Sequence, residues 1–113
     1  MTTRGSDAEN LAAAFLQRAG LKIVVRNYRC RFGEIDVIAR DGNTLVFVEV
    51  RMRSSDRYGG AAASITAAKR AKLLRAARHY IADIAQVPAC RFDALLVSGD
   101  DRAIEWLKSA FEA

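Results

Sequence analysis

The chain has 113 residues, of which 51% are hydrophobic and 27% are charged. This balance is typical of one compact domain, so we expect a single domain over residues 1–113 and exclude a disordered tail or a separate substrate domain. The 18 Lys and Arg outnumber the 13 Asp and Glu and give a net charge of +5, which favours a polyanionic partner such as DNA or RNA.

The beginning of the chain has no apolar segment of the signal-peptide kind, and no apolar run is long enough to span a bilayer. We therefore expect a cytoplasmic protein with no membrane partner. Cys30 and Cys90 lack the spacing of a thiolate metal site. We interpret both as reduced, with a single disulfide as the alternative.

The first predicted element is a helix over residues 6–19. Apolar residues follow one helical stripe there, and Ser6 with Glu9 fits a capping box at its start. Gly20 suits the position just past the helix end, where the backbone often turns left-handed. The capping box by itself explains a glutamate at position 9.

Three strands are predicted next, because apolar and β-branched residues alternate between turn signals. The strongest turn signal is Asp41-Gly42, which is typical of a tight hairpin. The pattern predicts a three-strand meander over residues 21–29, 34–40 and 44–52.

The second half of the chain is predicted to return to the sheet through a helix. Helix formers dominate residues 64–83, and a further strand is expected at 91–98. A strand, helix and strand in this order form a β-α-β crossover, so the strands at 44–52 and 91–98 should be parallel. The last segment, from residue 103, fits either a strand or a short helix. The sequence thus predicts an α/β fold with a mixed sheet and flanking helices.

Two carboxylates stand out because they interrupt apolar strands. Asp36 follows Glu34-Ile35, and Glu49 lies between Val48 and Val50. Side chains alternate along a strand, so Glu49 shares a face with Arg51, and pairing of the two strands would bring Asp36 to the same spot. Such a pair offers hard oxygen ligands to Mg²⁺ or Mn²⁺, which can activate water against a phosphodiester.

Other residues extend this predicted metal site. The carbonyl of Val50 could supply a further oxygen, and Glu9 is a candidate third carboxylate if the first helix begins beside the strand ends. Arg51 could hold a phosphate oxygen through its planar guanidinium. The alternative is structural: Asp36 and Glu49 would be polar positions on half-exposed strands that pair with nearby cations.

These residues form part of a longer pattern that resembles the YraN-like family of uncharacterised bacterial proteins. More distantly, a Glu on a first helix, an Asp on a strand and Glu-x-Lys on the next strand resembles the PD-(D/E)XK nuclease superfamily, especially the archaeal Holliday junction resolvases. The likeness to the YraN-like family covers nearly the whole chain, at Ala8-Glu9, Ala12, Leu16, Gly20, Asn27, residues 33–36 and 46–51, Arg53, Gly59, Lys69 and Arg91-Phe92-Asp93.

The resemblance implies a restriction-endonuclease-like fold and a role in handling nucleic acid, but no established reaction. One departure bears on catalysis, because these families usually have Lys where this chain has Arg51. Arg stays protonated, so a general-base role at this position is lost while electrostatic stabilisation is kept.

The second predicted helix is the most basic segment. Lys69, Lys72 and Arg75 recur every three residues and suit a surface that follows a phosphate backbone; the alternative is a solvated helix face. In the preceding loop, Arg53, Arg57 and Tyr58 are candidate contacts to nucleic acid, with Tyr58 able to stack on a base. We assign His79 to compensation of the helix dipole, and Trp106 to the core or a homodimer contact.

We therefore expect a nucleic-acid-binding protein, with Asp36, Glu49 and Arg51 as the catalytic residues if a phosphodiester is hydrolysed. Branched or structured DNA or RNA is the expected substrate class. Two alternatives stay open: a module that binds nucleic acid without cleaving it, and an interaction protein that does not bind nucleic acid.

Overall fold

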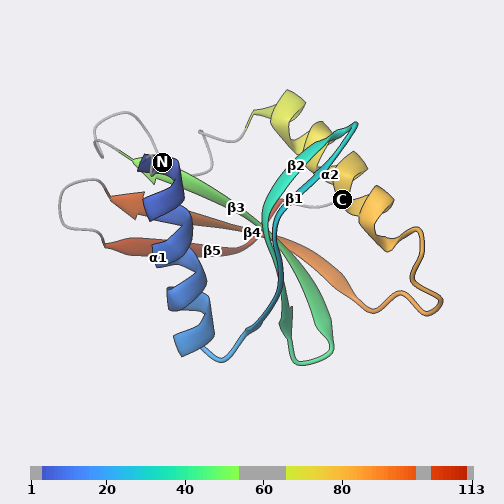
Figure 1. Cartoon of the computed structure of the whole chain (residues 1–113), viewed down its shortest axis with the longest axis horizontal. Coiled ribbons are helices and arrows are strands. Elements are labelled where there is room, and N and C mark those ends of the chain that lie inside the picture. The colour runs from blue at the N-terminus through green and yellow to red at the C-terminus, as the bar shows by residue number, and fades with distance from the viewer. Residues whose placement is uncertain (1–3, 54–65, 99–102, 112–113) are drawn as a thin grey trace.

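The computed structural model describes residues 4–53, 66–98 and 103–111. In this part of the chain, two helices flank one five-stranded sheet (Figure 1). The elements in chain order are α1 (Arg4–Arg18), β1 (Lys22–Cys30), β2 (Gly33–Asp41), β3 (Thr44–Arg53), α2 (Ala67–Ile81), β4 (Cys90–Ser98) and β5 (Ile104–Phe111).

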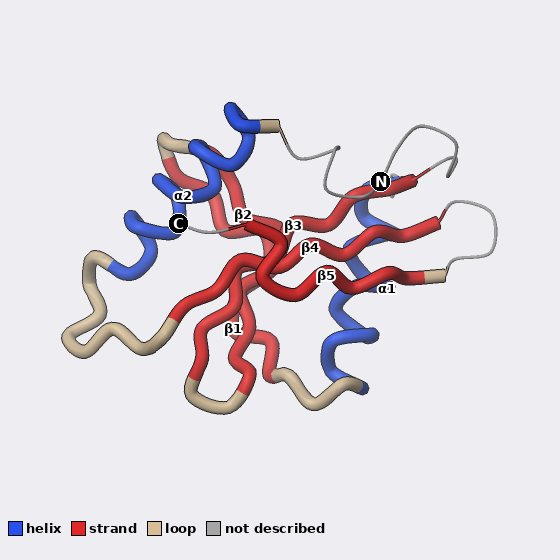
Figure 2. The backbone as a smooth tube through the Cα atoms, turned by 180° about the vertical axis from the view of Figure 1, so that it is seen from behind, coloured by secondary structure: helices blue, strands red, loops and turns tan. Residues whose placement is uncertain are grey.

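The sheet follows the chain in order, from β1 at one edge to β5 at the other. Neighbouring strands are antiparallel except β3 and β4, which are parallel and are connected through α2. The predicted meander, crossover and mixed sheet are therefore confirmed. The end of the chain, which the sequence left open, forms strand β5. Figure 2 shows β3, β4 and β5 lying side by side in front of α1.

The end of α1 follows from its glycine. Gly20 has φ +101°, and the two amides after the helix bond back to it: the Gly20 N–H donates to the Gln17 carbonyl and the Leu21 N–H to the Leu16 carbonyl. This pair of bonds is the Schellman arrangement expected of a C-terminal glycine. The predicted capping box is wrong, because α1 already begins at Arg4 and Ser6 lies inside its first turns.

The start of α2 is fixed by Thr66, whose hydroxyl accepts a hydrogen bond from the Lys69 N–H at 3.1 Å. Such a cap satisfies one of the amides that a helix start leaves unpaired. It places Lys69 in the first turn of α2, with its backbone fixed. The predicted helix over 64–83 is thus present, and it is shorter at both ends.

Each face of the sheet has its own core, and each core is covered by one helix. On the α1 side, Ala12 and Leu16 pack on Val37, Val48 and Leu95. On the α2 side, the buried cluster consists of Ile35, Ile38, Leu45, Phe47, Leu73, Ala76, Ala77 and Phe92. Both faces of β3 and β4 are covered, which explains why these strands are nearly continuous hydrophobic runs.

The sheet is not flat, because the β1–β2 hairpin bends away from the other strands until its tip reaches α2 (Figure 1). Asn27 in β1 has φ +55°, a left-handed conformation that Asn adopts more readily than most residues. The pairing of β2 with β3 ends at Val37 and Val48, although both strands continue. The two strands therefore diverge at the next pair of residues, Asp36 and Glu49.

Neither α1 nor α2 meets the length and hydropathy that a membrane-crossing helix requires, and these are the two helices of the described residues.

Candidate functional site: a carboxyl pair where two strands diverge

The candidate site lies where β2 separates from β3. Beyond Val48 the β3 backbone has no partner on β2, and the Val50 N–H donates instead to the Asp36 carboxylate at 2.8 Å. A buried amide requires an acceptor, so the Asp36 side chain takes the place of the missing backbone carbonyl. This hydrogen bond fixes the Asp36 side chain against β3.

Asp36 and Glu49 meet at this point, as the sequence predicted. Their carboxyl groups are hydrogen-bonded to each other, and only 3% of Glu49 is exposed. Burial and the neighbouring Asp36 carboxyl together raise the pKa of Glu49 to about 7, although the charge of Lys69 opposes this. Burial also raises the pKa of Asp36, although the Val50 N–H opposes this. Near neutral pH the two groups therefore share a proton.

Two cations reach Glu49 from different elements. Lys69 Nζ on α2 lies 3.3 Å from Glu49 Oε2, and Arg51 Nη1 on β3 lies 3.4 Å from the same oxygen. Both side chains are more than a third exposed, at 39% for Lys69 and 36% for Arg51, whereas that of Glu49 is 4% exposed. The two cations thus lie between the buried carboxyl group of Glu49 and solvent. The pairing with Glu49 also accounts for a lysine at a helix start, where the dipole disfavours it.

Glu9 and Glu34 lie at the margin of the pair. Burial raises the pKa of Glu9, and the charges of Asp36 and Glu34 add to this. Glu9 also bonds to the Asn27 side chain, while Glu34 forms an exposed ion pair with Arg29 at 3.3 Å. Next to Glu9, the Arg26 side chain of β1 donates to Asn10 Oδ1 of α1 at 2.7 Å. The first part of α1 therefore lies beside the strands, as the sequence prediction for Glu9 required.

The donor atoms fit a divalent cation of the Mg²⁺ type. Within 4–53, 66–98 and 103–111, no three Asp, Glu, His or Cys side chains form a cluster that could hold a metal ion. Mg²⁺, however, is commonly held by one or two carboxylates and keeps several waters. Asp36 and Glu49 suit that mode, since a cation would replace the shared proton. Glu9 does not complete a three-carboxylate set here, so ligand roles for Glu9 and for the Val50 carbonyl stay predictions.

The predicted nucleic-acid contacts are distributed unevenly. Lys69 lies at the carboxyl pair, whereas Lys72 and Arg75 are exposed further along α2. Arg57 and Tyr58 lie outside the described residues, as does the side chain of Arg53, whose backbone ends β3.

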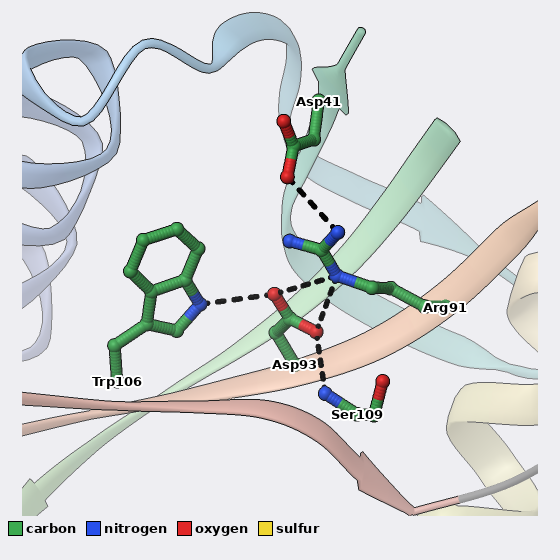
Figure 3. A network of polar contacts seen from close by, with 5 residues as sticks. All are labelled: Asp41, Arg91, Asp93, Trp106 and Ser109. Atoms are coloured by element: carbon green, nitrogen blue, oxygen red, sulfur yellow. Dashed lines mark hydrogen bonds and ion pairs between the residues drawn. The ribbon is translucent and has the colours of Figure 1, made fainter. Parts of the chain in front are cut away.

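A second buried carboxylate, Asp93 on β4, was not identified as a site from the sequence. It is completely buried and accepts hydrogen bonds from Arg91 Nε at 3.0 Å, Trp106 Nε1 at 2.9 Å and the Ser109 N–H at 2.9 Å (Figure 3). Arg91 continues to Asp41 at 2.9 Å, and the hydrogen bond with Asp93 raises the pKa of the guanidinium. Asp93 thereby connects β4 to β5 and, through Arg91, to the β2–β3 turn.

The backbone of β5 is shaped around Asp93. The register between β4 and β5 shifts next to this residue, and Ser109 has φ +52°. This bulge turns the Ser109 N–H toward the carboxylate. Trp106, which we expected in the core or at a dimer contact, is half-buried; its ring packs edge-on against Phe15 of α1 at 5.8 Å. The only sequence signal for this cluster was Arg91-Phe92-Asp93 within the family-like pattern.

Comparison with known proteins gives consistent matches. The model of the uncharacterised protein family UPF0102 matches residues 8–97. A UPF0102 protein of Nitrosomonas europaea is 62% identical over 110 residues, covering 96% of this chain and 93% of its own. A UPF0102 protein of Nitrosospira multiformis is 56% identical, and the match covers 96% of this chain and 92% of that protein. A UPF0102 protein of Methylobacillus flagellatus is 54% identical over the full length of both chains.

Proposed function

The chain belongs to the uncharacterised protein family UPF0102, and we propose that it is a nucleic-acid-binding domain with a restriction-endonuclease-like fold and a metal-dependent phosphodiesterase site. The observation that carries this proposal is the buried carboxyl pair of Asp36 and Glu49, with Lys69 and Arg51 beside it. Branched or structured DNA or RNA is the substrate class, and the cytoplasm is the proposed location.

The energetics of the pair support a functional role. Burial raises the pKa of both carboxyl groups, and two neighbouring buried carboxylates destabilise the fold when both are ionised. A side chain retained only for structure would gain more from a neutral residue or from a fully paired charge. Perturbed carboxyl groups beside exposed cations are typical of catalytic and binding sites.

The roles follow from the contacts. Asp36, held by the Val50 N–H, and Glu49 would hold Mg²⁺ or Mn²⁺. When bound, the ion would supply an activated water and neutralise charge on the phosphate. Lys69 and Arg51 are exposed enough to turn from Glu49 to phosphate oxygens and stabilise the charge that develops there. Arg51 does not accept a proton, so the proton of that water would have to pass to another group or to solvent.

A second function is favoured by one specific residue. Because Arg51 stands where the nuclease pattern has Lys, a domain that binds nucleic acid without cleaving it is the rival. Both the cleaving and the non-cleaving version of the proposal include a relationship to the PD-(D/E)XK nuclease superfamily.

A Mn²⁺-dependent cleavage assay on duplex, branched and single-stranded substrates separates these functions. We would compare wild type, Arg51→Lys and Glu49→Ala, with Glu34→Ala as an exposed-carboxylate control. Cleavage by wild type, or only by Arg51→Lys, that is lost in Glu49→Ala supports the metal site. If every variant binds substrate and none cleaves it, the non-catalytic module is correct. If none binds, both functions are excluded.

A further inference from the structure

A second group of cations lies beyond the carboxyl pair, at the tip of the β1–β2 hairpin. The strands pair up to Cys30 and Gly33, so the turn consists of Arg31 and Phe32. This turn rests on α2: a Cβ atom at Gly33 would lie 3.6 Å from the Lys72 Cβ, and the Phe32 ring packs edge-on against His79 at 5.9 Å. Residues distant in the sequence thus form one surface.

Two members of this surface, Arg31 and His79, are held by contacts with neighbouring side chains. The Arg31 guanidinium lies 4.9 Å from the centre of the Phe32 ring, a cation–π contact that holds a long side chain in place. The Tyr28 hydroxyl lies 2.5 Å from His79 Nδ1. If the hydroxyl donates to Nδ1, the proton of the neutral imidazole is on Nε2, which then presents a donor. Pre-ordered donors lose less conformational entropy when an anion binds.

The same surface carries cations that form no ion pair within the described part of the chain. Lys69, Arg51 and Arg29 are paired with carboxylates. By contrast, none of the carboxylates in the described segments forms an ion pair with Arg31, Lys72 or Arg75. These three side chains and His79 are exposed. The charges of Arg31, Lys72 and Arg75 are therefore available to an external anion.

The helix geometry connects this surface to the carboxyl pair. At 100° per residue, Lys72, Arg75 and His79 lie within an arc of about 60° on α2, and Lys69 lies about 60° from Lys72. Lys69 and His79 are ten positions apart, or about 15 Å along the helix axis. One strand of nucleic acid rises about 3.4 Å per nucleotide, so the surface extends over about four nucleotides from Lys69.

We propose that Arg31, Lys72, Arg75 and His79 form a phosphate-binding surface for a nucleic-acid strand, and that this surface extends over about four nucleotides from the carboxyl pair. This assignment rests on the proposed function for the identity of the anion, and it adds the hairpin tip and His79 as contacts. The contacts are to the backbone, so binding is independent of base sequence and applies to DNA and RNA alike.

The test is metal-free binding of labelled oligonucleotides of about 20 nucleotides, measured by fluorescence anisotropy over a range of salt. The variant is Arg31→Gln with Lys72→Gln. The control is Lys22→Gln with Arg40→Gln, which removes one Lys and one Arg from an exposed cross-strand pair at the other end of the hairpin. Both double variants change the net charge from +5 to +3, since 5 − 2 = 3.

We expect the surface variant to lose about tenfold or more in affinity and to flatten the slope of log K against log salt by about 1.4–1.8, since each lost phosphate contact contributes about 0.7–0.9. The control should keep the wild-type slope. Thermal unfolding of each variant verifies folding. Equal salt slopes in the two double variants would overturn the proposal of a phosphate-binding surface.

The two proposals fail in different ways. One outcome is that wild type binds with a salt slope that the surface variant loses, and yet cleaves nothing with Mn²⁺. That result would exclude the phosphodiesterase and support the phosphate-binding surface. If wild type cleaves and both double variants keep the salt slope of wild type, the phosphate-binding surface is excluded and the phosphodiesterase is supported. If wild type binds no oligonucleotide, the surface is excluded, and Mn²⁺ calorimetry still tests the pair.

Discussion

The sheet contains two buried acidic sites that differ in how well they are satisfied. Asp93 has no exposed area, and three neighbouring groups donate to it at 2.9–3.0 Å. Glu49 is 3% exposed, lies beside another carboxyl group, and meets its cations only at 3.3–3.4 Å. Short, numerous donors stabilise an ionised carboxylate, whereas a like-charged neighbour and long contacts destabilise it.

The two sites also lie on opposite faces. Alternation along β4 puts Asp93 opposite Phe92 and therefore on the α1 side, where Trp106 packs on Phe15. Glu49 follows Val48 of the α1-side core and therefore faces α2, where Lys69 reaches it. The comparison indicates that Asp93 stabilises the fold, and that ionisation of the Asp36–Glu49 pair costs stability, which is in line with the ligand role that we propose for this pair.

Asp93→Ala should give the largest change in stability. It leaves the Trp106 and Ser109 donors and the part-buried Arg91 guanidinium without their acceptor, so we expect a loss of about 3–5 kcal/mol in the free energy of unfolding. Urea denaturation followed by circular dichroism measures this loss. The exposed pair variant Glu34→Ala is the control and should change the value by less than about 0.5 kcal/mol. A loss below about 1 kcal/mol would contradict the structural role.

Glu49→Gln should have its main effect on metal binding. Calorimetry with Mn²⁺ near neutral pH should show binding in wild type and an affinity at least about 100-fold lower, or about 2.7 kcal/mol, in the variant, since one of two anionic ligands becomes neutral. Binding to wild type should release protons, because the ion displaces the proton that the pair shares. Equal heats in both proteins would show that Glu49 is not a ligand.

The stability of the metal-free protein should depend on pH through Glu49. The pKa of Glu49 is about 7 in the folded protein and 4.5 in the unfolded chain. Between these pH values the folded state therefore holds a proton that the unfolded state has released. This contribution to stability is fully present below pH 4.5 and is lost as pH rises through 7. We expect the melting temperature to fall from about pH 5 to about pH 8 by a few degrees, on the order of 1 kcal/mol.

Glu49→Gln is also the control for this pH dependence. Glutamine resembles the protonated carboxyl group. The melting temperature of the variant should therefore change less with pH over the same range, and the variant should be more stable than wild type at the alkaline end. A variant that follows the wild-type curve would assign the pH dependence to other groups.

Trp106→Phe should give the smallest effect. The ring contact with Phe15 is largely retained, while Asp93 loses one of its donors and keeps the others. A single lost hydrogen bond of this kind costs about 1 kcal/mol, or about 4 °C in melting temperature. Differential scanning calorimetry measures it. A loss as large as that of Asp93→Ala would mean that Trp106, rather than the carboxylate, holds β5 in place.

Much of the fold could be predicted because its signals are local. Alternation identified the strands, Gly20 the end of α1, and Asp41-Gly42 the hairpin. The start of α1 was wrong because residues before Ser6 continue the helix. Alternation also placed Glu49 on one face with Arg51, and the hydrogen bond between Asp36 and Glu49 confirms that this pair meets.

The remaining features depend on contacts between distant residues. The sequence did not reveal that Arg31 and His79 share a surface, because this depends on how the tip of the β1–β2 hairpin packs against α2. Nor did it reveal that Asp93 gathers donors from β4 and β5, since this requires the left-handed turn at Ser109.

The sequence by itself determined the order of helices and strands and the face on which each strand residue lies, because both follow from periodicities of a few residues. The tertiary structure alone decided how the acidic groups are satisfied. β2 leaves β3 after Val37, which gives Asp36 an amide to accept, and α2 begins where Lys69 reaches Glu49. Where two strands part and where a helix axis lies depend on the packing of the whole core, and no local pattern encodes them.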